Sequence, residues 1–315
     1  MPKSVALYTL GCKLNFAESS TIAQQLMKNG FERKEFHEAA DLYVINTCSV
    51  TDHADRKCKK VVSEALKYNP NAYIVIVGCY AQLKPEEIAN IPGVDMVLGA
   101  AEKFQLMDYL HSLNKEPKVR LHNQPIKDVN EFVPGFSEGD RTRMFLKVQD
   151  GCDYFCSFCT IPLARGKSRS ANIETTLKQV HDATAKGVKE VVLTGVNLGD
   201  FGVNHEEDFY GLIQELDKID QVKRYRISSI EPNLLIDDII RYSLDDLFFS
   251  FEYERISAYT IKLTRDAELD IENDVTKSLI KKVSESVKRR RKGQPVRLIY
   301  DEEMPETAIA YLMKR

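Results

Sequence analysis

The sequence predicts an α/β protein in three parts: an open parallel sheet, the opening half of a (β/α) barrel, and a carboxyl-terminal α+β segment of different character. Over the first two parts, β-branched runs alternate with helix-forming stretches, which is the pattern of parallel sheets. A length of 315 residues suits two or three domains, and 43% apolar residues suffice for packed cores. The net charge of −3 gives the chain no general attraction to nucleic acid, so any RNA contact needs a local basic patch.

The amino terminus and the cysteine content predict a cytoplasmic protein. Residues 1–4 lead directly into a strand-like run at 5–10, which leaves no room for a signal peptide. No apolar run approaches the length of a membrane span, so no membrane partner is expected. The odd count of seven cysteines favours a reducing compartment over a disulfide scaffold.

Residues 1–125 are expected to form the open parallel sheet. Strand-like runs are found at 5–10, 42–45, 73–77 and 96–98, and helix-like stretches at 17–29, 54–68 and 85–90. Three of these strands end in a cysteine, namely Cys12, Cys48 and Cys79. Because the carboxyl ends of parallel strands lie along one edge, the three thiols are expected to be neighbours. This arrangement predicts a three-thiolate site.

The alternative is that each cysteine is an ordinary small buried residue. Two of the three, Cys12 and Cys79, follow a glycine that would let the backbone approach a ligand closely, which favours a site. Cys58 lies at no strand end and is interpreted as a structural or surface thiol.

A segment rich in Pro, Asn and charge runs from about Asn123 to Asp140, and residues 126–140 are expected to link this domain to a second one at 141–243. The second domain begins as half of a (β/α) barrel. Its expected strands cover 144–148, 190–194 and 224–229, and its expected helices cover 177–185 and 209–216.

A CxxxCxxC loop follows the first strand of this half barrel and contains Cys152, Cys156 and Cys159. The loop is too short to close disulfides, but it can bring three thiolates to one iron–sulfur cubane and leave one iron open. A zinc knuckle and three buried thiols are the alternatives, although a fourth Cys or His is not nearby.

This loop resembles that of radical S-adenosylmethionine (SAM) enzymes, in which the open iron of a [4Fe-4S] cluster binds the amino and carboxylate groups of SAM. The resemblance implies that further residues contact SAM. Phe158 would pack on the adenine, and Thr194, Gly195 and Asn197 follow the strand whose end helps to hold the SAM amino group. Ser229 and Glu231 lie at the next strand end, facing the site. On position alone, Glu231 is equally well interpreted as a solvent-exposed charge before a helix.

Residues 1–243 resemble the radical-SAM methylthiotransferases. Short motifs around the first three cysteines carry this resemblance, and these motifs are Gly11–Asn15, Asn46–Thr51 and Gly78–Gln82. Ile161-Pro162 and Arg165–Arg169 also fit the family. Ala54–Cys58, Thr194–Asp200 and Arg226–Pro232 are most similar to the branch that modifies N6-threonylcarbamoyladenosine beside the tRNA anticodon.

The resemblance implies a specific chemistry and specific partners. Cys152, Cys156 and Cys159 would hold the cluster that cleaves SAM, and Cys12, Cys48 and Cys79 a second [4Fe-4S] cluster that carries the sulfur. The product would be a methylthio group on C2 of the adenosine. The expected partners are the tRNA anticodon stem-loop and an electron donor such as flavodoxin. The alternative within the family is the branch that acts on a ribosomal protein.

Several basic residues near the cluster loop predict a local positive surface that would suit RNA phosphates. They are Arg141, Arg143, Lys147, Arg165, Lys167 and Arg169. A solvated charged face is the alternative, and Arg165 could equally serve SAM or the fold.

From residue 244 to 315 the sequence resembles an internal fragment of polyphosphate kinase, through the runs 248–253, 258–266 and 296–305. The fragment carries neither the phosphorylated histidine nor the phosphate tunnel of that family, so no kinase activity is expected. The later barrel strands and the RNA-binding β domain of methylthiotransferases are replaced, which predicts impaired turnover and an unpaired strand edge. An inactive fusion that only binds iron–sulfur clusters is therefore a further alternative.

Overall fold

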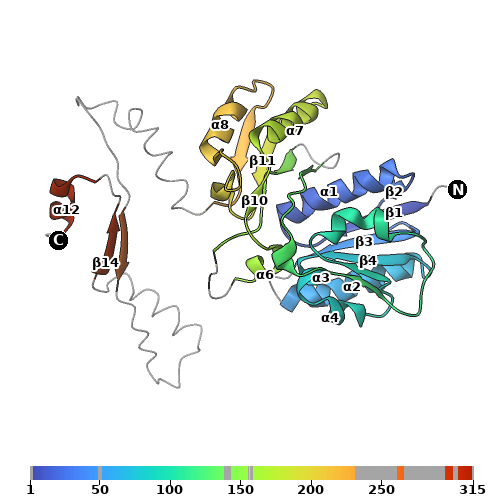
Figure 1. Ribbon diagram of the computed structural model, residues 1–315. Helices are drawn as coiled ribbons and strands as arrows, with labels where there is room; N and C mark the ends of the chain where they lie inside the picture. Colours follow the sequence, from blue (N-terminus) through green and yellow to red (C-terminus); the bar gives the residue numbers. More distant parts are fainter. Residues whose placement is uncertain are drawn as a thin grey trace, which may run out of the picture. The chain divides into compact units, whose positions relative to one another are not determined.

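The computed structural model describes residues 3–48, 52–137, 143–154, 156, 159–230, 261–265, 295–300 and 304–313. The chain divides into two compact units, Met1–Leu234 and Leu235–Arg315. The predicted fold class is confirmed, because the first unit contains an open parallel sheet followed by the start of a (β/α) array (Figure 1). The second unit contains an antiparallel strand pair and a helix.

The first sheet has six parallel strands in the order β2-β1-β3-β4-β5-β6. These strands are β1 (Ser4–Thr9), β2 (Glu32–Lys34), β3 (Leu42–Thr47), β4 (Tyr73–Gly78), β5 (Met96–Leu98) and β6 (Arg120–His122). The helical elements are α1 (Lys13–Lys28), α2 (Asp52–Tyr68), α3 (Cys79–Leu83), α4 (Pro85–Ala89), the 3₁₀ turn η1 (Glu102–Gln105) and α5 (Leu106–Tyr109).

Helices cover both faces of this sheet, because successive strand residues point to opposite sides. Ile74 and Ile76 of β4 pack in one apolar cluster with side chains from α2, α3 and α4. Val75 and Val77 pack in the other cluster with side chains from α1 and α5. Figure 1 shows α1 on one side of the sheet and α2, α3 and α4 on the other. Both faces are thus buried, as in doubly wound folds.

Two details differ from the sequence-based expectation. The edge strands β2 and β6 were not predicted, because they are short and largely polar. Helix α1 begins at Lys13, ahead of the expected start, since Cys12 in extended geometry occupies its N-cap position.

Cys58 is fully buried within α2, which identifies it as a structural thiol rather than a surface one.

The expected linker at 126–140 contains regular structure. It includes the 3₁₀ turn η2 (Ile126–Asp128) and the short strand β7 (Gly135–Phe136), which pairs antiparallel with the next sheet. Gly135 also lies against Thr21 of α1. The described part of this connection is therefore fixed to both domains, and it is a strand-and-turn crossing rather than a loose tether.

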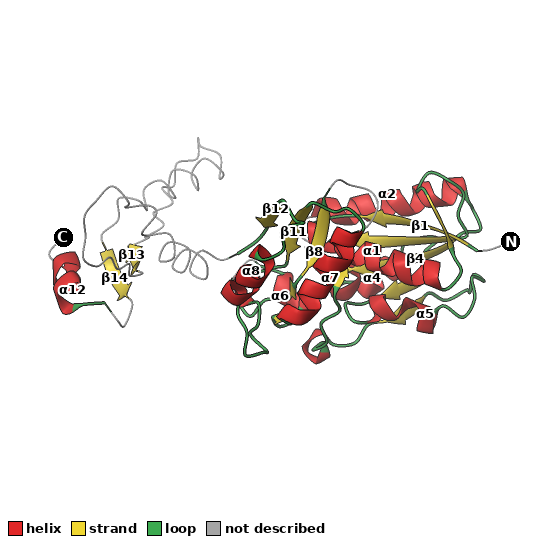
Figure 2. Ribbon diagram, turned by 90° about the horizontal axis from the view of Figure 1, so that it is seen from above, coloured by secondary structure: helices red, strands yellow, loops and turns green. Residues whose placement is uncertain are grey.

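The second sheet has the order β12-β11-β8-β7, in which β8, β11 and β12 are parallel. Its further elements are β8 (Met144–Lys147), β11 (Glu190–Thr194), β12 (Arg224–Ile227), α6 (Ile161–Arg165), α7 (Ile173–Ala185), η3 (Leu198–Asp200) and α8 (Phe209–Asp217). A small antiparallel pair joins β9 (Gln149–Asp150) to β10 (Arg169–Ser170). Figure 2 shows α7 and α8 beside this sheet. Among the described residues, β12 pairs only with β11 and is largely exposed, as expected for an edge.

In the second unit, β13 (Ile261–Arg265) pairs antiparallel with β14 (Pro295–Tyr300), and α12 (Glu306–Met313) follows. Strand β13 lies within the run 258–266 that carries the resemblance to polyphosphate kinase, whereas the run 248–253 lies outside the described residues. Within the described ranges, the structure contains no helix with the length and apolarity needed to span a membrane.

Candidate functional site

The first cysteine triad lies at the carboxyl edge of the six-stranded sheet. Cys12 follows β1, Cys48 follows β3, and Cys79 is the first residue of α3 directly after β4. The register aligns the ends of these strands, with Thr9 opposite Asn46 and Thr47 opposite Gly78. Three thiols that are far apart in sequence therefore share one edge.

Two glycines at this edge, Gly11 and Gly78, allow neighbouring strand ends to lie close together because they have no Cβ. Gly11 has φ of 111°, and a Cβ placed on it would lie 2.7 Å from the Cβ of Cys48 and 3.2 Å from its Sγ. Gly78 has φ of 102°, and a Cβ placed on it would collide with both Oδ1 of Asn46 and the carbonyl oxygen of Thr47, at the end of β3. These positive φ values favour glycine. Among protein atoms, the close neighbour of each glycine lies at or directly after the end of β3.

Amide side chains hold the strand ends together. Asn15 of α1 donates from Nδ2 to the carbonyl oxygens of Leu10 (2.8 Å) and Thr47 (3.1 Å). Asn46 donates from Nδ2 to the carbonyl oxygen of Asn15 at 3.1 Å. The Sγ of Cys12 donates to Oδ1 of Asn15 at 3.7 Å. Because Asn15 and Asn46 are fully or almost fully buried, these bonds fix the edge rather than exchange with water.

The second triad lies in the loop after β9. Cys152 and Cys159 are half-buried and Cys156 is exposed. The backbone N–H of Cys159 donates to the carbonyl oxygen of Cys156 (3.0 Å), and that of Cys152 donates to Gly166 (3.0 Å). Burial raises the pKa of the Cys152 thiol, and the nearby charges of Cys159 and Cys156 act in the same direction. The three thiols thus lie in one neighbourhood, while Phe158 lies outside the described residues.

The donor chemistry of both triads fits an iron–sulfur cluster. Cysteine sulfur is the usual ligand of such clusters. Among the described residues, no three Cys, His, Asp or Glu side chains are close enough to hold one metal ion. Each thiolate of a cubane binds a different iron, so cluster ligands stand farther apart than the ligands of a single ion.

A cavity of about 370 Å³ opens between Cys12 of the first triad and the second sheet. On one side it is lined by the segment from Gly11 to Leu14, which includes Cys12, and by Phe16. The opposite side is formed by Arg143, Phe145, Thr194, Gly195, Ser228 and Ser229. The cavity therefore brings Cys12 together with three of the residues expected at SAM. Asn197 is buried just beyond β11, and Glu231 lies outside the described residues.

Gln149, a residue that sequence reasoning missed, connects the cluster loop to the loop after β11. Its side chain is fully buried. Oε1 accepts hydrogen bonds from the backbone N–H groups of Val196 (2.8 Å) and Asn197 (2.9 Å). Nε2 donates to the carbonyl oxygen of Gly151 at 2.8 Å. A glutamine directly after the mostly apolar strand-like run at 144–148 and just before the CxxxCxxC loop is the sequence signal that would have identified it.

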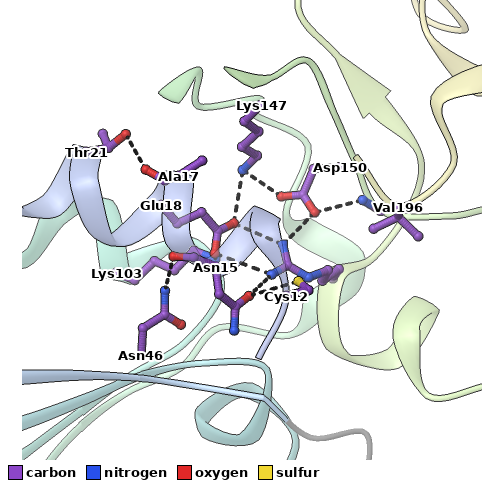
Figure 3. Close-up of polar contacts among 12 residues, drawn as sticks. Cys12, Asn15, Ala17, Glu18, Thr21, Asn46, Lys103, Lys147, Asp150 and Val196 are labelled. Atoms are coloured by element: carbon purple, nitrogen blue, oxygen red, sulfur yellow. Dashed lines mark hydrogen bonds and ion pairs between the residues drawn. The ribbon is translucent and has the colours of Figure 1, made fainter. Parts of the chain in front are cut away.

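The expected basic surface is wrong for three of its six members, because Lys147, Arg165 and Arg169 are buried. They belong to an ion network, named here the buried ion cluster, that joins the two domains of the first unit (Figure 3). The cluster consists of Glu18, Lys103, Lys147, Asp150, Arg165 and Arg169. Lys167 is exposed and Arg143 half-buried, while Arg141 lies outside the described residues.

Glu18 of α1 is the acceptor at the centre of the cluster. Its carboxylate lies 2.8 Å from Lys103 Nζ, 3.1 Å from Lys147 Nζ and 2.9 Å from the Arg165 guanidinium. Asp150 lies 2.8 Å from both Lys147 and Arg165, and 3.2 Å from Arg169. Arg165 therefore bridges the carboxylates of the two domains.

The cluster shifts the pKa values of both carboxyl groups downward. Burial raises the pKa of Glu18, but the charges of Arg165, Lys103 and Lys147 outweigh it and hold that pKa well below its ordinary value. The pKa of Asp150 is lowered in the same way, against burial, by Lys147, Arg165 and Arg169. Both carboxyl groups are therefore ionised at neutral pH.

An open parallel sheet with thiols at its carboxyl edge, followed by a (β/α) array that opens on a CxxxCxxC loop, is the arrangement that the sequence resemblance to radical-SAM enzymes implies. The fold resembles that of the radical SAM methyltransferase TsrM from Kitasatospora setae, which was solved with tryptophan and a SAM analogue bound. That likeness has a TM-score of 0.52 at 12% identity, and it covers 76% of this chain and 57% of the other.

The resemblance to methylthiotransferases is confirmed. The chain is 42% identical over 249 residues to the threonylcarbamoyladenosine tRNA methylthiotransferase MtaB of Bacillus subtilis, and 40% identical over 240 residues to that of Thermotoga maritima. These matches cover 75% and 76% of this chain and 53% and 54% of the relatives. A tRNA-2-methylthio-N(6)-dimethylallyladenosine synthase of Clostridium perfringens is 30% identical over 252 residues, or 76% of this chain and 55% of that protein. The chain thus spans about half the length of the curated relatives it matches.

Two family descriptions match separate parts of the chain. Residues 4–99 match "Uncharacterized protein family UPF0004", and residues 204–315 match "Polyphosphate kinase middle domain". The second match begins ahead of the expected junction at 244. Helix α8 and strand β12 lie in this overlap, and they belong to the first compact unit.

Proposed function

We propose that the chain is a tRNA methylthiotransferase in its first 243 residues, and that it uses SAM and two [4Fe-4S] clusters to place a methylthio group on C2 of N6-threonylcarbamoyladenosine. Relatives at 40% identity and above are named for the threonylcarbamoyladenosine reaction. All the relatives reported above are named for tRNA, which favours RNA over a ribosomal protein as the substrate.

The observation that carries this proposal is the shared cavity. Cys12 lines it from the sheet domain, and Thr194, Gly195 and Ser229 line it from the opposite side. A transfer that needs both a sulfur carrier and a SAM-derived radical requires two centres beside one substrate space. When bound, the two clusters would supply the one-electron cleavage of SAM and the sulfur to be inserted.

The residues of the chain itself would position and shield the reactants. Gln149 holds the cluster loop against the loop after β11, which keeps the expected SAM contacts in register with Gly151. Lys13 and Arg143 line the same cavity and place positive charge where RNA phosphates would enter. We further propose a cytoplasmic setting and an electron donor such as flavodoxin.

A second candidate is a fusion that binds clusters without turnover. The polyphosphate kinase match at 204–315 favours it, because this part of the chain matches another family and the methylthiotransferase matches cover about half of the relatives' length. This second candidate predicts iron loading without product.

The test is an anaerobic reaction of the reconstituted chain with dithionite, SAM and tRNA that lacks the modification. We expect free 5′-deoxyadenosine in the reaction mixture and the methylthio-adenosine nucleoside in a tRNA digest, both far below the yield of a full-length relative measured in parallel. Iron loading with neither product would establish the cluster-binding fusion. Methylthiolation of a ribosomal protein in place of tRNA would overturn the proposed substrate.

A further inference from the structure

The buried ion cluster carries an excess of positive charge. Four cationic side chains share two carboxylates, so the formal charge of the six side chains is +2. All six side chains are deeply buried, from 0% exposure at Glu18 to 5% at Arg169. Burial of an uncompensated charge is costly, so a structure with such an excess calls for a nearby anion.

Neutral groups offset only part of this charge. Arg169 donates to the carbonyl oxygens of Glu131, Arg165 and Lys167. Lys147 Nζ lies 5.1 Å from the ring centroid of Phe104 and 5.3 Å from that of Phe132, within cation–π range. These dipoles and ring faces solvate the cations without cancelling their formal charge.

Two thiols of the first triad lie within the electrostatic reach of these cations. The charge of Arg165 acts on both Cys79 and Cys12, and that of Lys103 acts on Cys79. Arg165 also donates from Nη2 to Oδ1 of Asn15, the atom that accepts from Cys12. The positive charge of Arg165 therefore lies beside the sheet edge where Cys12 follows β1 and Cys79 follows β4. Figure 3 shows Cys12 and Asn15 at this edge.

Three thiolates on a cubane carry more negative charge than its core offsets, and reduction adds a further negative charge. Arg165 ends α6, the helix that follows the SAM-type loop, yet it reaches the triad of the other domain. The packing of the second domain against the sheet domain thus places the positive charge of Arg165 beside the first triad.

We propose that Arg165, with Lys103, is the counter-charge of the cluster held by Cys12, Cys48 and Cys79, and that it raises the reduction potential of that cluster. Glu18 sets the size of this effect because its carboxylate neutralises part of the same charge. The inference rests on the proposed function, since it assumes a cluster at the first triad. Arg165 and Glu18 would then act on the cluster without binding it, and their variants would shift its reduction midpoint in opposite directions.

The test is a redox titration of the full chain, monitored by electron paramagnetic resonance, with Cys152, Cys156 and Cys159 changed to Ala so that one cluster remains. Dithionite supplies the single electron. Arg165→Gln is expected to lower the midpoint so that the ratio of reduced to oxidised cluster falls about ten-fold at fixed potential, or about 59 mV. Glu18→Gln is expected to raise the midpoint, and Arg165→Lys to stay near the parent.

The matched control is Lys167→Gln, which removes an exposed cation two positions away and is expected to leave the midpoint unchanged. Lys103→Gln provides the same sign of change as Arg165→Gln from the sheet domain, should the arginine variant fail to fold. A merely structural role would move both Glu18 and Arg165 variants in one direction or neither. Normal iron loading with unchanged midpoints would overturn this inference alone, whereas a parent triad that binds no iron would overturn the proposed function with it.

Discussion

Glu18→Gln tests how strongly the two domains of the first unit depend on one buried carboxylate. The side chain is fully buried and lies within 3.1 Å of three cations. Removing one partner of a buried, hydrogen-bonded ion network costs about 3–5 kcal/mol, because the remaining charges lose their compensation. At pH 7 we therefore expect the free energy of unfolding of this unit to fall by about that amount.

The pH dependence of this loss follows from the direction of the pKa shift. The folded pKa of Glu18 lies below its ordinary value of 4.5, so its ionisation stabilises the fold fully above pH 4.5. That stabilisation is lost as the pH falls through the lower, folded pKa. The difference between parent and variant should thus be constant near neutrality and shrink as the solution is acidified below pH 4.5.

Hydrogen exchange is the appropriate assay, because the chain has two compact units and a whole-chain signal would mix them. Amides of β3 and β8 report on the two domains that Glu18 joins. Glu87→Gln is the matched control, since its ion pair with Lys84 is about half exposed and should contribute less than about 1 kcal/mol. Equal, small effects of Glu18→Gln and Glu87→Gln at pH 7 would refute the reasoning.

Two further predictions concern the geometry of the candidate site. Gly11→Ala should lower the free energy of unfolding by about 1–3 kcal/mol and weaken iron binding at the first triad, because its Cβ would press on Cys48. Thermal melting is the measurement, and Gly30→Ala is the control, since Gly30 also has a positive φ but open space around it. Gln149→Leu should leave the N–H groups of residues 196–197 unpaired at about 1–3 kcal/mol, visible as faster exchange of those two amides, and unchanged exchange would contradict the link.

The strand ends were predictable because their signals are local. A β-branched run followed by Gly-Cys or Thr-Cys indicates both the strand and its carboxyl end, and parallel pairing then brings the cysteines to one edge. The expected strand at 190–194 coincides with β11 for the same reason. The described part of the predicted half barrel follows from this local periodicity.

The buried ion cluster was not predicted because its partners are distant in sequence. Glu18 and Lys147 are 129 positions apart, and the periodicity of one segment does not report on the other. A signal did exist, since Glu18 falls on the apolar stripe that Leu14, Ile22 and Leu26 form along α1. An acid at a core position requires a buried partner, and that requirement identifies a domain interface before its partners are known.

The measurement that tests the central claim most directly is the iron and sulfide content of the anaerobically reconstituted chain and its cysteine variants. Two cubanes predict about eight iron atoms per chain, and about four when either triad is changed to Ala. Cys58→Ala, which removes a buried thiol of α2, should retain all of them. Iron that is lost only with Cys152, Cys156 and Cys159, or equally with Cys58, would contradict a second cluster at Cys12, Cys48 and Cys79.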